Sequence, residues 1–191
     1  MLEVNFFPFP TLFTERLKLR RIVKEDVHRL YHIRSNEELM RYLARPVATK
    51  LDDARTLIDK IDNGLETNSG ITWAISYRTD EQKLLGTIGY WRLEKENFRA
   101  EIGYILDKQE HGKSVMREAI QKVLEFGFSD LRLHSVEARV SPANEASVRL
   151  LEKVGFVKEG LFRENFFFNG AFIDSGVYTL LAANFNKPAN P

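Results

Sequence analysis

Hydrophobic and polar positions follow two periods in the first part of the chain. Residues 16–22 alternate leucine with basic residues, which predicts a half-buried first strand. Apolar residues then recur every three to four positions over 24–36 and 52–68, which predicts two amphipathic helices with a shorter helical turn near 38–43. We therefore expect one strand followed by a group of helices.

The period changes to two from residue 71. Residues 71–77 and 84–93 flank a polar turn, and this pattern predicts an antiparallel hairpin. Residues 100–106 form another apolar run that is rich in branched and aromatic side chains. We expect this run to pair with the hairpin as the third of three consecutive antiparallel strands.

Helical spacing returns after residue 114. The predicted buried face consists of Met116, Ala119, Ile120, Val123, Leu124, Gly127 and Phe128. A right-handed crossover through this helix would place the next strand parallel to 100–106. The elements expected after it are strand 134–140, a helix from Asn144 to Gly155, and strands 156–168 and 172–182 joined at Asn169-Gly170.

These elements predict a mixed α/β fold, with a largely antiparallel sheet of six to seven strands and helices on both faces. The 191 residues are expected to form a single domain, 1–191. We expect residues 1–13, which are rich in Phe and Pro, to be an extended arm packed on the domain or on a partner. Residues 183–191 are expected to be a C-terminal tail.

Composition excludes several classes of function. Lys and Arg number 28 and Asp and Glu number 27, so the net charge of +1 gives no basic field that would indicate nucleic acid as a direct partner. The absence of cysteine excludes a disulfide framework, a thiolate metal site and a cysteine nucleophile, and it suits the cytoplasm. No long apolar run or signal peptide is evident, so we expect no membrane association. His28 and His32 lie one helical turn apart, but no third ligand follows and we predict no metal site.

The turn Gly112-Lys113-Ser114 lies between a predicted strand and a predicted helix, and it has the character of a phosphate-binding site. The first turn of a helix carries unpaired N–H groups and the positive end of the helix dipole. Gly112 would let the backbone approach a pyrophosphate, and Lys113 would add a cation. A Walker A loop would need glycine at the position of Asp107, so we do not favour a nucleoside triphosphate.

Two motifs at matching separation carry a resemblance to a known family. Gln109, Gly112 and Ser114 fit the pattern Gln/Arg-x-x-Gly-x-Gly/Ala, and Asn144 and Ser147 precede Gly155-Phe156 with the spacing N-x-x-S-x-x-x-x-x-x-x-G-F. This pair of motifs resembles the GNAT superfamily of N-acetyltransferases, in particular its ribosomal-protein N-terminal acetyltransferase (RimJ/RimL-like) branch. The resemblance extends from about residue 14 to residue 181.

The resemblance implies acetyl-CoA as co-substrate, bound in a wedge where strands 100–106 and 134–140 splay apart, with a bulge at Gly103 as the expected start of the splay. No metal is implied. The cofactor-binding residues that it implies are Ile105, Leu106, Gln109, His111, Gly112, Lys113, Ser114, Val115, Asn144 and Ser147.

The resemblance also implies catalytic roles. Ser147 would face the thioester sulfur, and Glu101 is the leading candidate for the general base, with Glu137, Glu164 or a water molecule as alternatives. In isolation, Asn144 would be an ordinary helix N-cap and Ser147 a surface serine. Phe166 stands where related ribosomal-protein enzymes place a proposed base, so the chain departs from that pattern.

The predicted activity is direct transfer of an acetyl group to an amine, because the chain lacks cysteine and no motif places His111 or His134 to activate Ser147. The leading acceptor is the N-terminal α-amine of a protein. A small-molecule amine, such as a polyamine or aminoglycoside, and a non-catalytic acyl-CoA-binding role are the alternatives. The chain is expected to be a monomer or a homodimer.

Overall fold

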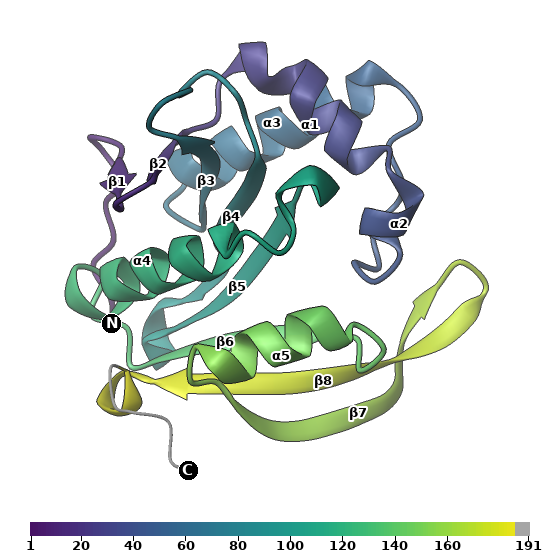
Figure 1. The fold of residues 1–191 in the computed structure, drawn as a ribbon. Helices are drawn as coiled ribbons and strands as arrows, with labels where there is room; N and C mark the ends of the chain where they lie inside the picture. The colour runs from purple at the N-terminus through teal and green to yellow at the C-terminus, as the bar shows by residue number, and fades with distance from the viewer. Residues whose placement is uncertain (186–191) are drawn as a thin grey trace.

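The computed structural model of the chain describes residues 1–185, so most of the expected C-terminal tail (186–191) lies outside the described residues. One sheet of eight strands forms the centre, in the order β1-β2-β3-β4-β5-β6-β8-β7 (Figure 1). The strands are β1 (Leu12–Phe13), β2 (Leu17–Arg21), β3 (Ile71–Tyr77), β4 (Gly86–Glu94), β5 (Arg99–Leu106), β6 (Ser135–Val140), β7 (Val157–Phe168) and β8 (Ala171–Leu181). The helices are α1 (Val27–Arg34), α2 (Glu37–Met40), α3 (Leu51–Glu66), α4 (Val115–Ser129) and α5 (Glu145–Lys153).

The pairing of the strands confirms the predicted fold class. Strands β3, β4 and β5 are antiparallel neighbours, and β6 runs parallel to β5 after the α4 crossover. The eighth strand is β1, a dipeptide within the predicted N-terminal arm, which pairs antiparallel with β2. Elsewhere in the arm, Leu2 and Phe6 are buried against the domain.

Helices cover both faces of the sheet because side chains on each strand alternate in direction. On one face, α4 packs on a core that includes Trp73, Ile88 and Ile102. On the other face, α1 and α3 pack in a second cluster with Ala74 and Ile105. Trp73 and Ala74 are consecutive residues of β3, and they lie in different clusters. Within residues 1–185, no helix is both long enough and apolar enough to span a membrane.

Strands β5 and β6 form the wedge that positions the site. They pair at Arg99–Ser135, Ala100–Val136 and Glu101–Glu137, and in the described chain their pairing stops there. Beyond these positions β5 continues along β4, while β6 continues along β8. The two strands therefore diverge, with α4 and α5 flanking the gap (Figure 1).

The bulge beside the wedge lies on β4, so the prediction of a bulge at Gly103 is wrong. Tyr90 pairs with Ile102 and Arg92 pairs with Glu101, which leaves Trp91 as the extra residue. Gly103 pairs regularly with Gly89. A Cβ atom on Gly103 would lie 3.3 Å from the Trp91 ring, so glycine leaves room for that ring. The bulge turns Trp91 toward solvent, where it is 45% exposed.

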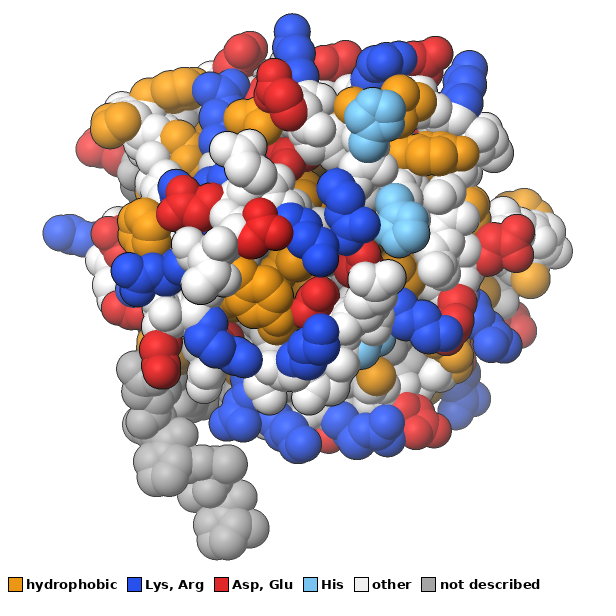
Figure 2. Space-filling view, turned by 45° about the horizontal axis from the view of Figure 1, so that its top comes forward, with side chains coloured by type: hydrophobic (Ala, Val, Ile, Leu, Met, Phe, Trp, Pro, Cys, Tyr) orange, Lys and Arg blue, Asp and Glu red, His pale blue; other side chains and the backbone are white. Residues whose placement is uncertain are grey.

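On the face drawn in Figure 2, basic and acidic side chains are interspersed over most of the surface, and several Lys and Arg side chains gather along its lower edge. This distribution agrees with the net charge of +1. Because the net charge is small, the attraction of charged ligands depends on local groups of charged residues and not on the overall field of the molecule.

Candidate active site

A cavity of about 530 Å³ lies in the wedge between β5, the start of α4 and the start of α5. The predicted cofactor-binding residues that line it are Ile105, Leu106, His111, Gly112, Ser114, Val115, Asn144 and Ser147. Gln109, Lys113 and Glu101 do not line it. The structure thus brings together most of the predicted set, which comes from segments far apart in the sequence.

The start of α4 presents backbone donors to this cavity. Gly112 and Ser114 have positive φ angles of 77° and 60°, and α4 begins directly after them. The first N–H with a helical partner is that of Glu118, which donates to Ser114 O over 3.1 Å. The earlier N–H groups of the helix, including those of residues 115–117, lack such partners by geometry. A Cβ on Gly112 would meet nothing within 4 Å, so the space in front of this turn is open.

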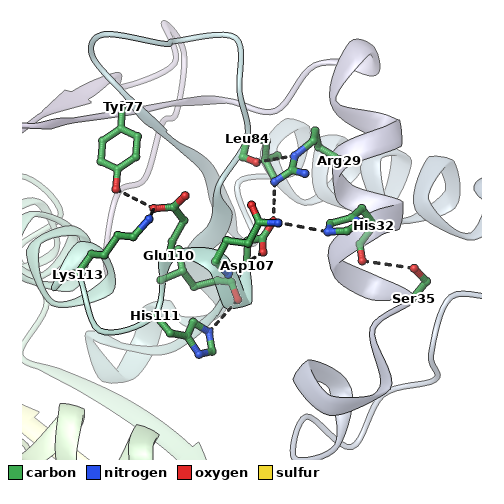
Figure 3. Close-up of polar contacts among 11 residues, drawn as sticks. Arg29, His32, Ser35, Tyr77, Leu84, Asp107, Glu110, His111 and Lys113 are labelled. Carbon is green, nitrogen blue, oxygen red and sulfur yellow. Dashed lines mark hydrogen bonds and ion pairs between the residues drawn. The ribbon is translucent and has the colours of Figure 1, made fainter.

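The loop before α4 is fixed from one side by Asp107 (Figure 3). Its carboxylate accepts hydrogen bonds from Gln109 N–H at 3.0 Å and from Arg29 at 2.6 Å, and it lies 3.7 Å from His32 Nε2. Burial alone would raise the pKa of Asp107, but these hydrogen bonds hold it below its usual value. Asp107 therefore anchors the loop to α1. No group of three potential metal ligands that includes His32 occurs in the described residues.

Glu110 fixes the other side of the loop (Figure 3). The Tyr77 hydroxyl and the Lys113 ammonium both donate to its Oε2 atom, at 2.8 and 3.0 Å. Burial tends to raise the pKa of Glu110, yet these two donors keep it below its usual value. The cation that the sequence predicts at Lys113 is therefore paired with Glu110 in this structure.

Other basic side chains line the cavity, and sequence reasoning missed them. They are Arg117, Arg139, Arg149 and Lys153. Arg117 lies in the first turn of α4, three residues after Ser114, and this position beside the predicted turn is a signal that could have identified it. The remaining three are separated from the turn in sequence, and only the folded wedge brings them to it.

These features fit a coenzyme A chain. Past Glu101 and Glu137 the facing edges of β5 and β6 are not paired with each other, so their N–H and C=O groups can bind an extended amide-containing chain between them. The open turn at Gly112 and the N–H groups of α4 suit a pyrophosphate at one end of that chain. The residues present therefore fit coenzyme A.

Ser147 lines the cavity and is not the isolated surface serine considered above. Its Oγ atom lies 2.7 Å from the hydroxyl of Tyr104, a residue of β5 that also lines the cavity. Asn144 caps α5, because its Oδ1 atom accepts the Ser147 N–H at 3.2 Å. Burial raises the pKa of Tyr104 to about 12, so the phenol keeps its proton at neutral pH. Sequence reasoning did not select Tyr104, since its two-residue offset from Ile102 indicates only a common strand face.

Glu101 and Glu137 lie side by side at the point where the wedge opens. The Glu101 side chain is 8% exposed, 3.8 Å from Arg92 Nη1 and 4.0 Å from Arg139 Nε. Burial raises the pKa of Glu101 despite these arginines, with a further contribution from Glu137. Glu137 accepts from Arg139 at 2.7 Å. Glu101 thus lies beside the opening of the wedge but does not line the cavity.

Glu164 and Phe166 lie on β7 and do not line the cavity. Glu164 occupies an irregular stretch of the β7–β8 pairing with a φ angle of 49°, and its N–H donates to Asp174 over 2.8 Å. It is solvent-exposed, as is Phe166. This stretch brings neither residue to the Tyr104–Ser147 pair in the structure.

Comparison with protein families agrees with this geometry. The model of the acetyltransferase (GNAT) domain matches residues 16–157, which is most of the chain, and the chain belongs to this family. It is therefore an acetyl-CoA-dependent N-acetyltransferase. Its relative p20 from Bacillus licheniformis, an uncharacterized N-acetyltransferase, is 39% identical over 172 residues, which cover 90% of this chain and 96% of that protein.

Two solved structures illustrate the range of acceptors found with this fold. Spermidine N-acetyltransferase from Vibrio cholerae, solved in complex with CoA and spermine, has a TM-score of 0.79 at 24% identity, over 91% of this chain and 100% of that one. RimL, a ribosomal L7/L12 alpha-N-protein acetyltransferase solved in complex with coenzyme A, has a TM-score of 0.81 at 19% identity, over 90% and 98%. At these identities the likeness establishes a shared fold.

Proposed function

We propose that the acceptor is the N-terminal α-amine of a protein, as in the ribosomal-protein N-terminal acetyltransferases. One observation carries this choice: the acidic residue among those that line the described cavity is Glu110, which is already paired with Lys113, whereas Arg117, Arg139, Arg149 and Lys153 are basic. A polyamine with several positive charges needs unpaired carboxylates, and the described lining of this cavity offers none.

The donor is held, in this proposal, by the two features already described. The N–H groups at the start of α4 and the Arg117 guanidinium bind the pyrophosphate. The facing edges of β5 and β6 bind the amide groups of the pantetheine arm. Asn144 sets the orientation of Ser147 by capping the first turn of α5.

Acetyl-CoA supplies the acetyl group as a reactive thioester. Ser147 Oγ donates a proton to the sulfur atom that leaves when the C–S bond breaks. Tyr104 donates to Ser147 Oγ in turn, because its phenol remains protonated and lies 2.7 Å away. The two hydroxyls thus form a proton-donating chain that ends at the sulfur, and the proton released by the amine restores the Tyr104 hydroxyl.

The amine loses a proton as the new C–N bond forms. An α-amino group has a pKa near ~7.7–8.0, so about a tenth of it is neutral at pH 7, whereas a lysine near ~10.4 is neutral only to the order of a thousandth. A weak base therefore suffices for an N-terminus. Glu101 is our candidate for the base, and it acts through a water molecule because it does not line the cavity.

A small-molecule amine is the second candidate, and the likeness to the spermidine enzyme of Vibrio cholerae supports it. Initial rates with an α-amine peptide, a peptide whose only amine is an internal lysine, and spermidine compare the two directly. We expect the α-amine peptide to react fastest, with intersecting lines at several fixed acetyl-CoA concentrations, because direct transfer requires a ternary complex.

Either of two results would contradict the proposal. If spermidine or the lysine peptide reacts faster than the α-amine peptide, the preferred acceptor is that amine and not a protein N-terminus. Parallel lines, together with an acetylated protein mass when acceptor is omitted, would show that a side chain acts as nucleophile and that transfer is not direct.

A further inference from the structure

Trp91 lies at the side of the wedge with a guanidinium group near its ring from each of two segments. The Cζ atom of Arg45 is 5.4 Å from the ring centroid, and that of Arg92 is 5.0 Å away. Arg45 comes from the connection between α2 and α3, whereas Arg92 follows Trp91 on β4. The bulge that exposes Trp91 therefore creates a surface where two positive charges converge on one aromatic ring.

Arg34, at the end of α1, adds a third positive charge. Its side chain is half-buried, its Nε atom is buried without a hydrogen-bond partner, and its Nη1 atom lies 3.7 Å from the sulfur of Met40. Burial, and then repulsion by Arg45, lowers the pKa of Arg34. We call Arg34, Arg45 and Arg92 the arginine patch.

The carboxylates nearby neutralise this patch only in part, through the ion pair of Glu101 with Arg92. Glu137 is bonded to Arg139, and Glu94 to Arg99, each at 2.7 Å. Glu101 lies between Arg92 and Arg139, at 3.8 and 4.0 Å. Across residues 1–185, no carboxylate forms an ion pair with Arg34 or Arg45. A partly buried guanidinium without a charged partner costs free energy of desolvation. An anion that binds from outside the chain would offset this cost.

The arginine patch is continuous with the cavity. Gly103 lines the cavity, and a Cβ on it would touch the Trp91 ring at 3.3 Å. The segment that joins Arg34 to Arg45 also contributes Leu39, Tyr42 and Leu43 to the cavity wall. A ligand with its amine in the wedge can therefore extend over Trp91 toward these arginines.

We propose that the arginine patch binds a carboxylate side chain close to the amine of the acceptor, so that the preferred acceptor is a protein N-terminus followed by acidic residues. This inference rests on the proposed function and makes its acceptor specific. A guanidinium presents a planar fork that matches a carboxylate with two hydrogen bonds, and the Trp91 ring gives the contact an apolar floor. The same charges repel lysine-rich termini and polyamines.

The test uses three peptides that differ only at positions two and three: Ser-Asp-Glu, Ser-Asn-Gln and Ser-Lys-Lys, each followed by the same neutral sequence. We measure kcat/KM for each with the full chain and saturating acetyl-CoA. We expect the acidic peptide to exceed the neutral one by about ten- to a hundredfold, since hydrogen bonds to charged groups contribute about that factor. The preference should shrink as salt is added.

Variants then assign the preference to the patch. Arg45→Gln should reduce the advantage of the acidic peptide about tenfold and leave the rate with the neutral peptide unchanged. Arg45→Glu should favour the Lys-Lys peptide over the acidic one. Arg55→Gln is the matched control, because Arg55 is an exposed arginine of α3 paired with Asp52 and should change nothing. Arg45 is exposed, so these variants keep the fold even where Arg34→Gln does not.

The outcomes separate this inference from the proposed function. If all three peptides are acetylated at equal rates, or if the acidic preference survives in Arg45→Glu, the arginine patch does not bind the acceptor although the α-amine activity stands. If no peptide is acetylated and another amine is, the proposed function itself fails.

Discussion

The two ends of the wedge differ in how their charged side chains are paired. In the loop before α4, Asp107 is paired with Arg29, and Glu110 is paired with Lys113. At the arginine patch, Arg34 and Arg45 have no carboxylate partner among the described residues, and Glu101 is shared between two other arginines. In the loop the acidic side chains are paired with basic ones, whereas at the arginine patch two guanidinium groups are left without a carboxylate.

This difference in charge pairing indicates how each end selects its ligand. Paired side chains fix the loop, and in our proposal the anion binds to backbone N–H groups, whose dipoles are aligned by the helix, together with Arg117. Unpaired guanidinium groups require the ligand to bring the compensating charge. In our proposal, the donor end therefore recognises a constant group largely by backbone geometry, whereas the acceptor end distinguishes ligands by their charge.

The comparison predicts its largest effect at Gly112. Gly112→Glu places a carboxylate in the open space before α4 and repels the pyrophosphate, so calorimetry should show coenzyme A affinity falling about a hundredfold or more. Gly112→Asn is the control, because asparagine tolerates the φ of 77° and is neutral. It should cost little affinity.

Equal affinity in a folded Gly112→Glu variant would contradict backbone recognition at this end. A loss of the same size in Gly112→Asn would show that backbone conformation, rather than charge, controls binding. Circular dichroism and thermal unfolding establish that each variant is folded before titration.

A smaller effect is expected at the Tyr104–Ser147 pair, which lies between the two ends. Ser147→Ala removes the proton donor and should lower kcat about 10²-fold with little change in acetyl-CoA affinity. Tyr104→Phe keeps the ring and removes the hydrogen bond to Ser147, so kcat should fall about tenfold. Tyr90→Phe removes another buried tyrosine hydroxyl, bonded to Val123 O, and should lower stability by about 1 kcal/mol while kcat is unchanged.

The double variant, Ser147→Ala with Tyr104→Phe, tests whether the two hydroxyls act together. If the two hydroxyls act as one chain, Tyr104→Phe should cost little more once Ser147 is alanine. Full multiplication of the two losses would mean that they act independently. Normal turnover in Ser147→Ala would show that Ser147 takes no part in catalysis and belongs only to the capped first turn of α5.

The sequence predicted the elements of this fold because local patterns determine them. Alternation defined β3, β4 and β5, and helical spacing defined α4. The bulge position was mispredicted, since glycine at 103 is a local signal for irregularity, whereas the irregular residue is Trp91 on the neighbouring strand. A bulge depends on the register between two strands, and no single segment encodes it.

The site shows the same limit. The Gly112 turn and the Asn144-x-x-Ser147 spacing are local motifs, and the structure brings both to one cavity. The neutralisation of Lys113 by Glu110 and the pairing of Tyr104 with Ser147 depend on how side chains meet in space, the second across 43 positions of sequence. The unpaired state of Arg34 is likewise a property of the folded environment.

The smallest effect concerns the paired charges of the loop, and pH reveals it. The folded-state pKa of Asp107 lies below the ordinary value of 3.8, so its ionised form contributes stability above that pH and loses it as pH falls through 3.8 and below. Asp107→Asn should unfold about 1–2 kcal/mol more easily at pH 7, because Arg29 loses a charged partner. Its free energy of unfolding should also fall less steeply toward acid than that of the unmodified chain. Urea unfolding at a series of pH values measures both.

Asp52→Asn provides the matched control for this measurement. Asp52 is exposed and paired with Arg55 within one helix, where an ion pair contributes little, so its removal should leave the free energy of unfolding nearly constant. If Asp107→Asn also leaves the free energy of unfolding nearly constant, the ion pair with Arg29 does not stabilise the loop. Charge pairing would then not explain how the donor end of the wedge differs from the acceptor end. A loss at pH 7 that disappears near pH 3 would instead locate that stabilisation in the ionised carboxylate.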